Sequence, residues 1–222
     1  MATGVLRGLF RRVCVGVVWV CAPAVWAGSI ETEFLEQPWP RQMVREYEVG
    51  KWPVRWRQKA SVTEGIFAGA SFNTTTPLEQ TWELATDYTD LGSMTPGVTA
   101  VRMIEQTPTR QVIQIDIKVL WKTLRLRFEI EQERPDAVRF RLVNPELGEY
   151  RGVCLMRQEP NHTQVELATW LKPAVRLPSG LILSVERIVL LRGIRNFLET
   201  CEQHLQDAHE QSVALGEVDK GR

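Results

Sequence analysis

The feature that most constrains the fold of this chain is a series of six alternating apolar and polar segments. In the clearest of them, Ile113, Ile115 and Ile117 alternate with Gln114 and Asp116. A period of two is typical of strands that turn one face to a core and the other to water. Turn residues separate the segments, so we predict an antiparallel sheet. The segments span residues 98–105, 113–121, 124–131, 138–142, 149–158 and 165–171.

A single long helix is expected after this sheet. Pro173 and Pro178 end the last strand, and Ser179 can cap the helix that follows. Apolar residues then recur at steps of three and four over about seven turns. These residues are Leu181, Val185, Ile188, Leu191, Leu198, Cys201 and Leu205. Such a helix is long enough to lie across the whole sheet, and a curved sheet around it leaves a natural hollow between the two.

The segment before the six strands adds one strand and one short helix. Ile66, Ala68, Ala70 and Phe72 alternate in a strand pattern. Residues 76–79, Thr-Pro-Leu-Glu, then fit a capping box with proline at the first helical position. The helix carries Leu78, Trp82 and Ala85 on one stripe and ends near residues 87–88. Together these elements predict an α+β fold with about seven strands.

The order of these elements resembles the START-like superfamily, also called the helix-grip or polyketide cyclase/dehydrase group. The resemblance runs from about Glu64 to Gln206. It is carried by Trp82 in the short helix, by the run Asp87–Leu91 and by the run Met94–Val98. It is strongest to the branch that includes coenzyme Q-binding START proteins. This resemblance implies a helix-grip fold with a cavity between the sheet and the C-terminal helix, which often holds a lipid, sterol, quinone or polyketide.

A hydrophobic small molecule of the lipid or quinone class is therefore the expected partner, held by inward-facing apolar side chains. Tyr88 and Met94, with the loop between them, are expected to control access to the cavity. The alternative is that the same side chains pack together as a dry core, because periodicity does not separate the two cases. The predicted ligand-binding residues are Phe72, Trp82, Tyr88, Met94, Ile113, Ile115, Ile117, Leu126, Phe128, Val165, Leu167, Leu181, Val185 and Ile188.

The chain carries no motif that points to catalysis, to a metal or to a cofactor, and we predict none of them. His162 lies in a turn, and His204 and His209 are five residues apart, which places them on different faces of a helix. Asp116 and Glu129 occupy the polar faces of their strands. A cyclase or dehydrase enzyme with the same cavity is an alternative that requires an inward acid, base or hydroxyl, and Asp116, Glu129 and Ser184 are its candidates.

Residues 28–63 are expected to form an extended arm that lays tryptophans on the main domain and to include one short strand. Trp39, Trp52 and Trp56 stand there among prolines and charged residues. A third reading of the protein is therefore an interaction module with a filled core and an exposed patch around these three rings. Peripheral contact of the same rings with a membrane and the oligomeric state both stay open.

The N-terminus has the features of an export signal. Arg7, Arg11 and Arg12 precede an uncharged run from Val13 to Ile30, and residues 25–27, Val-Trp-Ala, fit a cleavage site before Gly28. We predict an exported, periplasmic protein, with a membrane anchor through residues 5–27 as the alternative. The expected divisions are a signal peptide over 1–27, the arm over 28–63, a START-like domain over 64–210 and a flexible tail over 211–222.

The mature chain would carry a small net negative charge and no block of basic residues. Nucleic-acid binding requires clustered lysine and arginine, so it is disfavoured. Two cysteines, Cys154 and Cys201, remain after cleavage. Both stand at positions with an apolar pattern, which favours two separate buried thiols over a disulfide, although an oxidising compartment permits the bond.

Overall fold

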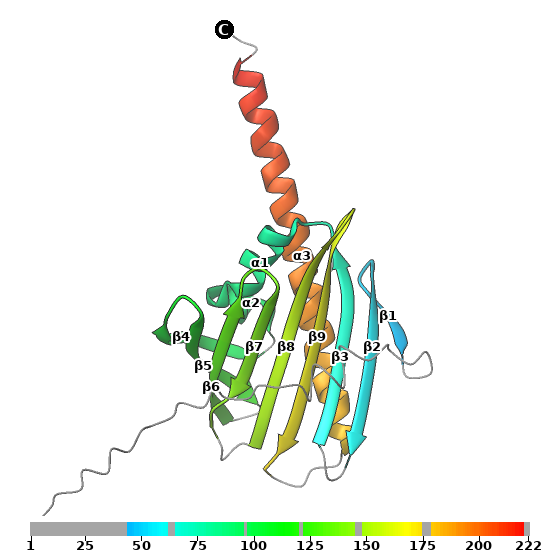
Figure 1. The fold of residues 1–222 in the computed structure, drawn as a ribbon, viewed down its shortest axis with the longest axis vertical. Coiled ribbons are helices and arrows are strands. Elements are labelled where there is room, and N and C mark those ends of the chain that lie inside the picture. Colours follow the sequence, from blue (N-terminus) through cyan, green and yellow to red (C-terminus); the bar gives the residue numbers. More distant parts are fainter. Residues whose placement is uncertain are drawn as a thin grey trace, which may run out of the picture.

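The computed structural model describes residues 44–61, 65–95, 97–119, 122–144, 148–174 and 179–219. Within these residues, one antiparallel sheet has the strand order β1-β2-β3-β9-β8-β7-β6-β5-β4 (Figure 1). The strands are β1 (Arg45–Val49), β2 (Trp52–Ser61), β3 (Gly65–Thr74), β4 (Val98–Gln106), β5 (Arg110–Val119), β6 (Lys122–Glu133), β7 (Ala137–Leu142), β8 (Gly148–Glu159) and β9 (His162–Pro173). The helices are α1 (Leu78–Thr86), the short 3-10 helix η3 (Tyr88–Asp90), α2 (Leu91–Met94) and α3 (Ser179–Asp219).

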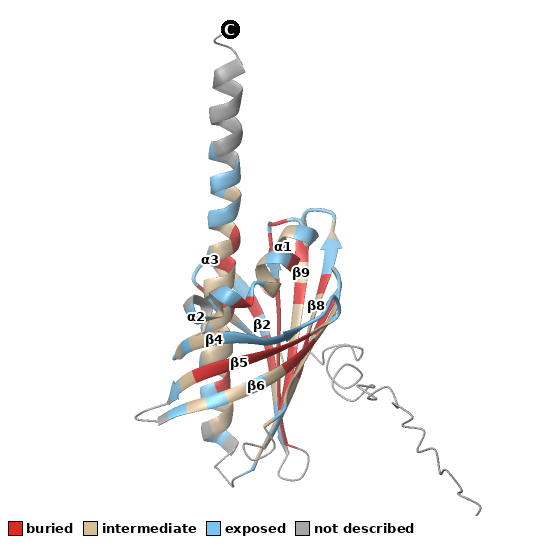
Figure 2. Cartoon of the chain, turned by 90° about the vertical axis from the view of Figure 1, so that its left-hand side faces the viewer, coloured by how far each residue is buried: buried red, intermediate tan, exposed pale blue. Residues whose placement is uncertain are grey.

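The long helix α3 lies against one face of the sheet, which confirms the predicted α+β helix-grip architecture. It packs on β1, β2 and β3 and is flanked by α1 and α2. The end of the sheet formed by β4, β5 and β6 turns around the helix (Figure 2). We call the face of the sheet toward α3 the inner face, and the opposite face the outer face. Among the described residues, no helix combines the length and the apolar character that crossing a membrane requires.

The antiparallel register assigns every strand residue to one face or the other. Ala70 of β3 pairs with Leu167 of β9, Leu167 with Cys154 of β8, and Cys154 with Val138 of β7. Directly paired residues share a face, so these side chains form a continuous inner row. The same row parity places Ile113 and Phe128, which pair across β5 and β6, on the inner face. The alternation in the sequence had predicted these faces for β5 and β6.

The strand count is higher than expected, because the predicted N-terminal arm contributes two strands. Residues 45–61 form the hairpin of β1 and β2, and β2 pairs with β3 along seven positions from Arg55 to Ser61. Trp56 is 1% exposed within the core, and Trp52 packs against the same core. The sheet thus begins at Arg45 rather than near Glu64. Trp39 lies outside the described residues, as does the predicted signal peptide.

The start of α1 differs from the predicted capping box. Thr76 makes no cap: its hydroxyl lies 2.7 Å from the Thr81 hydroxyl inside the core. The first helical amide, Leu78 N, instead donates to Gln158 Oε1 of β8 at 3.0 Å. Glu79 is turned outward and accepts from Arg134. A cap from a distant strand replaces the local one, and this also fastens α1 to the end of β8.

At the other end of the chain, α3 continues to Asp219 and projects past the sheet (Figures 1 and 2). Most of the segment that we expected as a flexible tail, 211–222, is therefore helical. The cause is that residues 199–215 contain neither proline nor glycine, so the sequence offers no signal that ends the helix before Gly216.

Candidate functional site

The inner face is divided into a packed end and an open end. Near α1 and η3, the side chains of β6, β7, β8 and β9 are buried in one cluster with Trp82 and Tyr88. Further along the same strands, away from α1, the inner side chains are only half-buried. The buried set is Phe72, Ile130, Val138, Met156 and Val165, and the half-buried set is Leu124, Leu126, Phe128, Phe140, Leu142 and Tyr150. Water thus reaches apolar side chains on the inner side of the sheet.

Three aromatic rings form the wall of this open end. Phe128 of β6, Phe140 of β7 and Tyr150 of β8 contact one another with centroid separations of 6.3, 6.1 and 6.0 Å. The two pairs that include Phe128 are nearly perpendicular, an arrangement that aromatic quadrupoles favour. Gly152 makes the cluster feasible, because a methyl group there would lie 2.3 Å from Phe140 Cζ.

The other wall of the open end is the first half of α3. Glu186 marks the side of the helix that meets the sheet, because the Thr169 hydroxyl of β9 donates to Glu186 Oε1 at 2.6 Å. Ile182 lies four residues before Glu186, Val189 three residues after it and Gly193 seven residues after it. These spacings place all three on the same side of the helix as Glu186. A methyl group on Gly193 would have no atom within 4 Å outside the local helix backbone. The space beside this half-buried, inward position is therefore empty.

A polar group interrupts the apolar walls where they meet. Glu186, Thr169 and Tyr150 come from α3, β9 and β8, and Tyr150 hydrogen-bonds to Thr169. Desolvation by burial raises the pKa of Glu186, an effect that the hydrogen bond from Thr169 partly offsets. Burial also raises the pKa of Tyr150, and the negative charge of Glu186 adds to that shift. Both groups therefore favour their neutral forms.

The predicted ligand-binding residues fall into distinct regions of the structure. Half-buried Ile117, Leu126, Phe128 and Leu167 lie on the inner face, and Leu126 and Phe128 line the open end. The members that lie in the packed end or in buried parts of the core are Phe72, Trp82, Tyr88, Ile113, Ile115 and Val165. The side chains of Met94 and Leu181 lie outside what the structure describes.

Two of the predicted residues were placed on the wrong side of α3. Val185 and Ile188 are 52% and 62% exposed, on the side of the helix away from the sheet. The buried residues of α3 are Glu186 and Ile194, which lie outside the predicted stripe, and Leu198 and Cys201, which belong to it. The stripe chosen from the sequence began with aliphatic residues and passed over Glu186. Because a helix repeats every 3.6 residues, a stripe displaced by one residue turns the predicted buried side of the first two turns by about 100°.

Tyr88, expected to control access, is held in the core. Its side chain is 9% exposed, and its hydroxyl accepts a hydrogen bond from Gln132 Nε2 at 3.1 Å. Burial raises the pKa of Tyr88 to about 12. Asp87 fixes the same loop, since its carboxylate accepts from the backbone N of Thr89 at 3.0 Å. These contacts give residues 87–89 a structural role.

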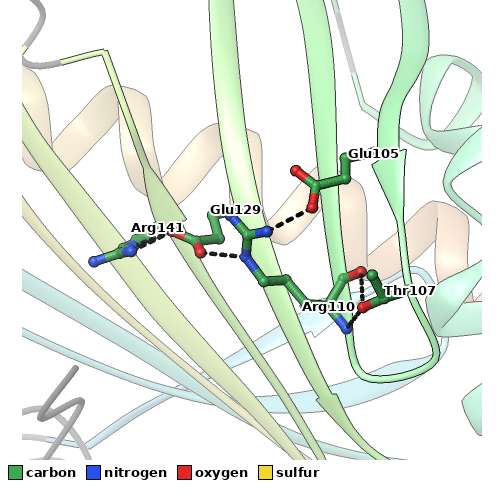
Figure 3. A network of polar contacts seen from close by, with 5 residues as sticks. All are labelled: Glu105, Thr107, Arg110, Glu129 and Arg141. Carbon is green, nitrogen blue, oxygen red and sulfur yellow. Dashed lines mark hydrogen bonds and ion pairs between the residues drawn. The ribbon is translucent and has the colours of Figure 1, made fainter. Parts of the chain in front are cut away.

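The three sequence candidates for an inward acid or hydroxyl do not face the hollow. Glu129 lies on the outer face between Arg110 and Arg141, with Arg110 Nε 2.6 Å from its carboxylate (Figure 3). Burial alone would raise the pKa of Glu129, but the hydrogen bonds from both arginines lower it overall. Asp116 pairs with Arg125 at 3.3 Å on the same face. Ser184 is exposed and donates to the Gly180 carbonyl within α3.

A concavity lies on the flank of α3 that faces β1. It is a groove of about 570 Å³ between β1 and the helix, lined by Tyr47, Glu48, Val49, Gly50, Leu191, Arg192, Arg195, Asn196 and Glu199. Its lining combines apolar residues with charged ones, which include the exposed Arg195–Glu199 ion pair. An apolar ligand is better matched by the open end of the inner face.

Sequence reasoning missed Phe140, Tyr150, Thr169, Glu186 and Gly193 as parts of the site. Glu186 had a detectable signal, since it is the single acid in the apolar run from Leu181 to Leu191. Tyr150 and Phe140 follow the same alternation as their neighbours, but their meeting depends on the pairing of Phe140 with Gly152. Within the described residues, no cluster of three metal-ligating side chains occurs.

Solved structures of low sequence identity share this fold. Human StAR-related lipid transfer protein 5 is 15% identical, with a TM-score of 0.56 over 78% of this chain and 93% of that one. A STAR-related lipid transfer protein from Xanthomonas axonopodis is 12% identical, with a TM-score of 0.56 over 72% and 99% of the two chains. An aromatase/cyclase from a Streptomyces species is 13% identical, with a TM-score of 0.57 over 68% and 96%. The protein is thus a START-like protein by fold.

The family assignment follows from the sequence itself. Residues 74–198, more than half of the chain, match the family described as polyketide cyclase / dehydrase and lipid transport. The chain belongs to this family. No curated protein matches it with significant sequence similarity.

Proposed function

We propose that this protein binds and carries a hydrophobic small molecule in the open end of the hollow between the sheet and α3. The ligand belongs to the lipid, quinone or polyketide-like class. Support comes from the apolar walls of the site and from the described relatives, whose names refer to lipid transfer and to cyclisation. Apolar walls stabilise an apolar ligand by roughly 25 cal/mol per Å² of surface removed from water.

The observation that carries this proposal is the empty space beside Gly193. In a dry core, a half-buried helix position that faces a sheet is in contact with neighbouring side chains. At Gly193 no such neighbour lies within 4 Å of the place where a methyl group would stand. The half-buried state of Leu126, Phe128 and Tyr150 across the same space agrees with a hollow that solvent reaches.

Gly193 also provides the sharpest test, because it can be enlarged without a steric clash at the point of attachment. The two variants are Gly193→Phe, which places a ring in the hollow, and Gly193→Ala, which adds one methyl group. Each is titrated with Nile red and with decyl-ubiquinone, and organic extracts of each purified protein are analysed by mass spectrometry. Circular dichroism monitors folding.

We expect Gly193→Phe to weaken binding of both probes by about tenfold. The ring occupies part of the hollow, so the ligand loses apolar contact with the walls worth about 1.4 kcal/mol. Gly193→Ala should bind within about twofold of the parent, a free-energy change within the spread expected for a harmless substitution. Equal binding by a folded Gly193→Phe variant would refute a site under α3. The co-purifying molecule identifies the ligand class, and a quinone there would support the coenzyme Q branch.

We propose further that the protein is exported to the periplasm after cleavage before Gly28. The support is the order of Arg7, Arg11 and Arg12, the uncharged run and the small residues near position 27. Intact mass measurement of protein from the periplasmic fraction should give the mass of residues 28–222. A full-length chain found only with membranes would instead support an anchor through residues 5–27.

Glu186 favours a second candidate, an enzyme of the cyclase or dehydrase type that uses the same hollow. A buried acid with a raised pKa beside a tyrosine can serve as a general acid. Recovery of the incubated ligand separates the two cases. A carrier returns the molecule unchanged, whereas an enzyme returns a cyclised or dehydrated product, and Glu186→Gln should then stop that conversion.

A further inference from the structure

One oxygen of Glu186 has no explained role in the fold. Glu186 is only 8% exposed, and its Oε1 accepts a hydrogen bond from the Thr169 hydroxyl at 2.6 Å. Oε2 is buried as well, and among the described residues it has no hydrogen-bond partner. A buried polar atom without a partner is costly, and an apolar residue of the same shape would avoid that cost. The site thus contains a buried carboxyl oxygen that no described residue of the protein hydrogen-bonds.

The surroundings of this oxygen place it at the edge of the hollow. Gly193, seven residues on and on the same side of α3, faces empty space. Tyr150, which hydrogen-bonds to Thr169, is also a member of the aromatic wall with Phe128 and Phe140. The polar group therefore stands where the helix wall and the aromatic wall converge, within an otherwise apolar lining.

We propose that Glu186 Oε2, with Thr169 and Tyr150 beside it, anchors the single polar group of the ligand, and that this group is an uncharged oxygen of a hydroxyl, ketone or quinone. This inference rests on the proposed function, since it assumes a hydrophobic ligand in the hollow. It specifies which end of that ligand lies at the junction of β8, β9 and α3.

The charges around the site argue for an uncharged polar group. Burial raises the pKa of Glu186 and so favours its protonated form, which can donate a hydrogen bond to a carbonyl or hydroxyl oxygen. The basic residues of β7, β8 and β9 stand at outer-face positions of the register: Arg139, Arg141, Arg151, Arg157 and Lys172. Arg187, next to Glu186, reaches Tyr47 of β1 at 3.2 Å. An anionic end group would therefore be buried without a cation from these strands.

The test compares ligands that differ only in their polar end. Dodecanol, dodecane and dodecanoate are each used to displace Nile red from the full protein at neutral pH. The decisive quantity is the ratio of the dissociation constants of dodecane and dodecanol, because it isolates the hydroxyl group from the shared chain. The variants are Glu186→Leu, which removes the polar group, and Tyr150→Phe, which removes one hydroxyl and keeps the ring.

A matched control comes from the outer side of the same helix. Glu199 is exposed and pairs with Arg195 at 2.8 Å, so Glu199→Leu makes the same chemical change away from the hollow. Thermal unfolding of each variant is measured in parallel. If Glu186 serves the ligand, Glu186→Leu should be at least as stable as the parent, because it removes a buried oxygen without a partner.

We expect the dodecane-to-dodecanol ratio to fall by about tenfold in Glu186→Leu, the usual effect of one buried hydrogen bond. Tyr150→Phe should lower it by about threefold, and Glu199→Leu should leave it unchanged. In the parent, dodecanoate should compete more weakly than dodecanol. An unchanged ratio in both site variants, or tighter binding of dodecanoate, would overturn the anchor. Failure of the parent to bind Nile red or any of the three chains would instead overturn the proposed function.

Discussion

Gly152 of β8 offers a stringent test of the site's geometry, because Gly152→Ala would place a methyl group between two fixed neighbours. The added carbon would lie 2.3 Å from Phe140 Cζ and 2.7 Å from the carbonyl oxygen of Ala168. Ordinary contacts between non-bonded carbon atoms are about 3.5–4.0 Å. The Phe140 ring can rotate away, but the Ala168 carbonyl is part of the paired strand β9 and cannot move without disturbing the sheet.

The expected cost follows from this combination of one movable and one fixed neighbour. Overpacking of a well-packed interior costs about 1–3 kcal/mol. In a protein of this size, each kcal/mol lowers Tm by about 2–4 °C. The displaced Phe140 ring would also enter the open end of the hollow, so that Nile red binding should weaken together with stability.

A double-mutant cycle separates the two neighbours. Phe140→Leu removes the ring, so Gly152→Ala should cost about 1 kcal/mol less in that background than in the parent. Unfolding in urea, followed by circular dichroism, measures all four proteins. A cost below about 0.5 kcal/mol for Gly152→Ala, or strictly additive effects, would show that the ring does not rest on Gly152.

Three further predictions concern stability and reactivity. The lowered pKa of Glu129 means that its stabilisation is present above the ordinary value of 4.5 and is lost as pH falls through the folded-state pKa, so the stability gap between the parent and Glu129→Gln should shrink in acid. The raised pKa of Glu186 gives the opposite pH dependence: its contribution to the free energy of unfolding is greatest below 4.5 and is lost as pH rises through the folded-state pKa. Urea unfolding of the parent and of Glu186→Gln across the same pH range should show this loss. Cys154 is a free thiol whose pKa burial raises to about 12, so the native protein should react slowly with a thiol reagent at this position and rapidly once unfolded, as mass spectrometry of labelled peptides can measure. Fast labelling of native Cys154 would contradict the raised pKa of its thiol.

Strong alternation made much of the sheet predictable from the sequence. From Ile113 to Ile130, apolar and polar residues alternate across two strands with few exceptions, and the structure pairs these strands residue by residue. The long apolar run after Ser179 likewise predicted α3. In the strands the local pattern and the final environment agree, because one face of each strand meets the core; in α3 the pattern predicted the helix but not which side of its first turns is buried.

The hairpin of β1 and β2 shows why other parts were missed. Trp52, Val54 and Trp56 alternate correctly toward the core, but the residue that follows each of them, Pro53, Arg55 and Arg57 in turn, is typical of a loop. The loop-like composition outweighed an alternating pattern that has only three core-facing residues, so the hairpin was not predicted. Their burial depends on the pairing of β2 with β3, which no local signal specifies.

The polar part of the site was missed for a related reason. Glu186 interrupts an apolar run, and a rule that seeks apolar stripes passes over it. The three residues that meet there belong to β8, β9 and α3, so that only the register of β8 with β9 and the rotation of α3 bring them together. Patterns of this kind are visible in a sequence only as exceptions to the core pattern.

The division of the inner face explains how one domain can be both stable and hollow. Trp82 of α1 and Tyr88 of η3 fill the space at the packed end of β6, β7 and β8, where Leu198 of α3 is 1% exposed. Burial of each such side chain contributes about 1.5–3 kcal/mol, which is enough for this half to hold α3 in place. At the open end the described residues include no helix equivalent to α1, and at Gly193 the long helix itself supplies no side chain. The open space beside Gly193 is therefore a consequence of where α1 ends. Leu198→Ala should cost about 2–5 kcal/mol of stability and release α3 from the packed end. Probe binding at the open end should then be lost, although Leu198 itself lies outside the proposed site.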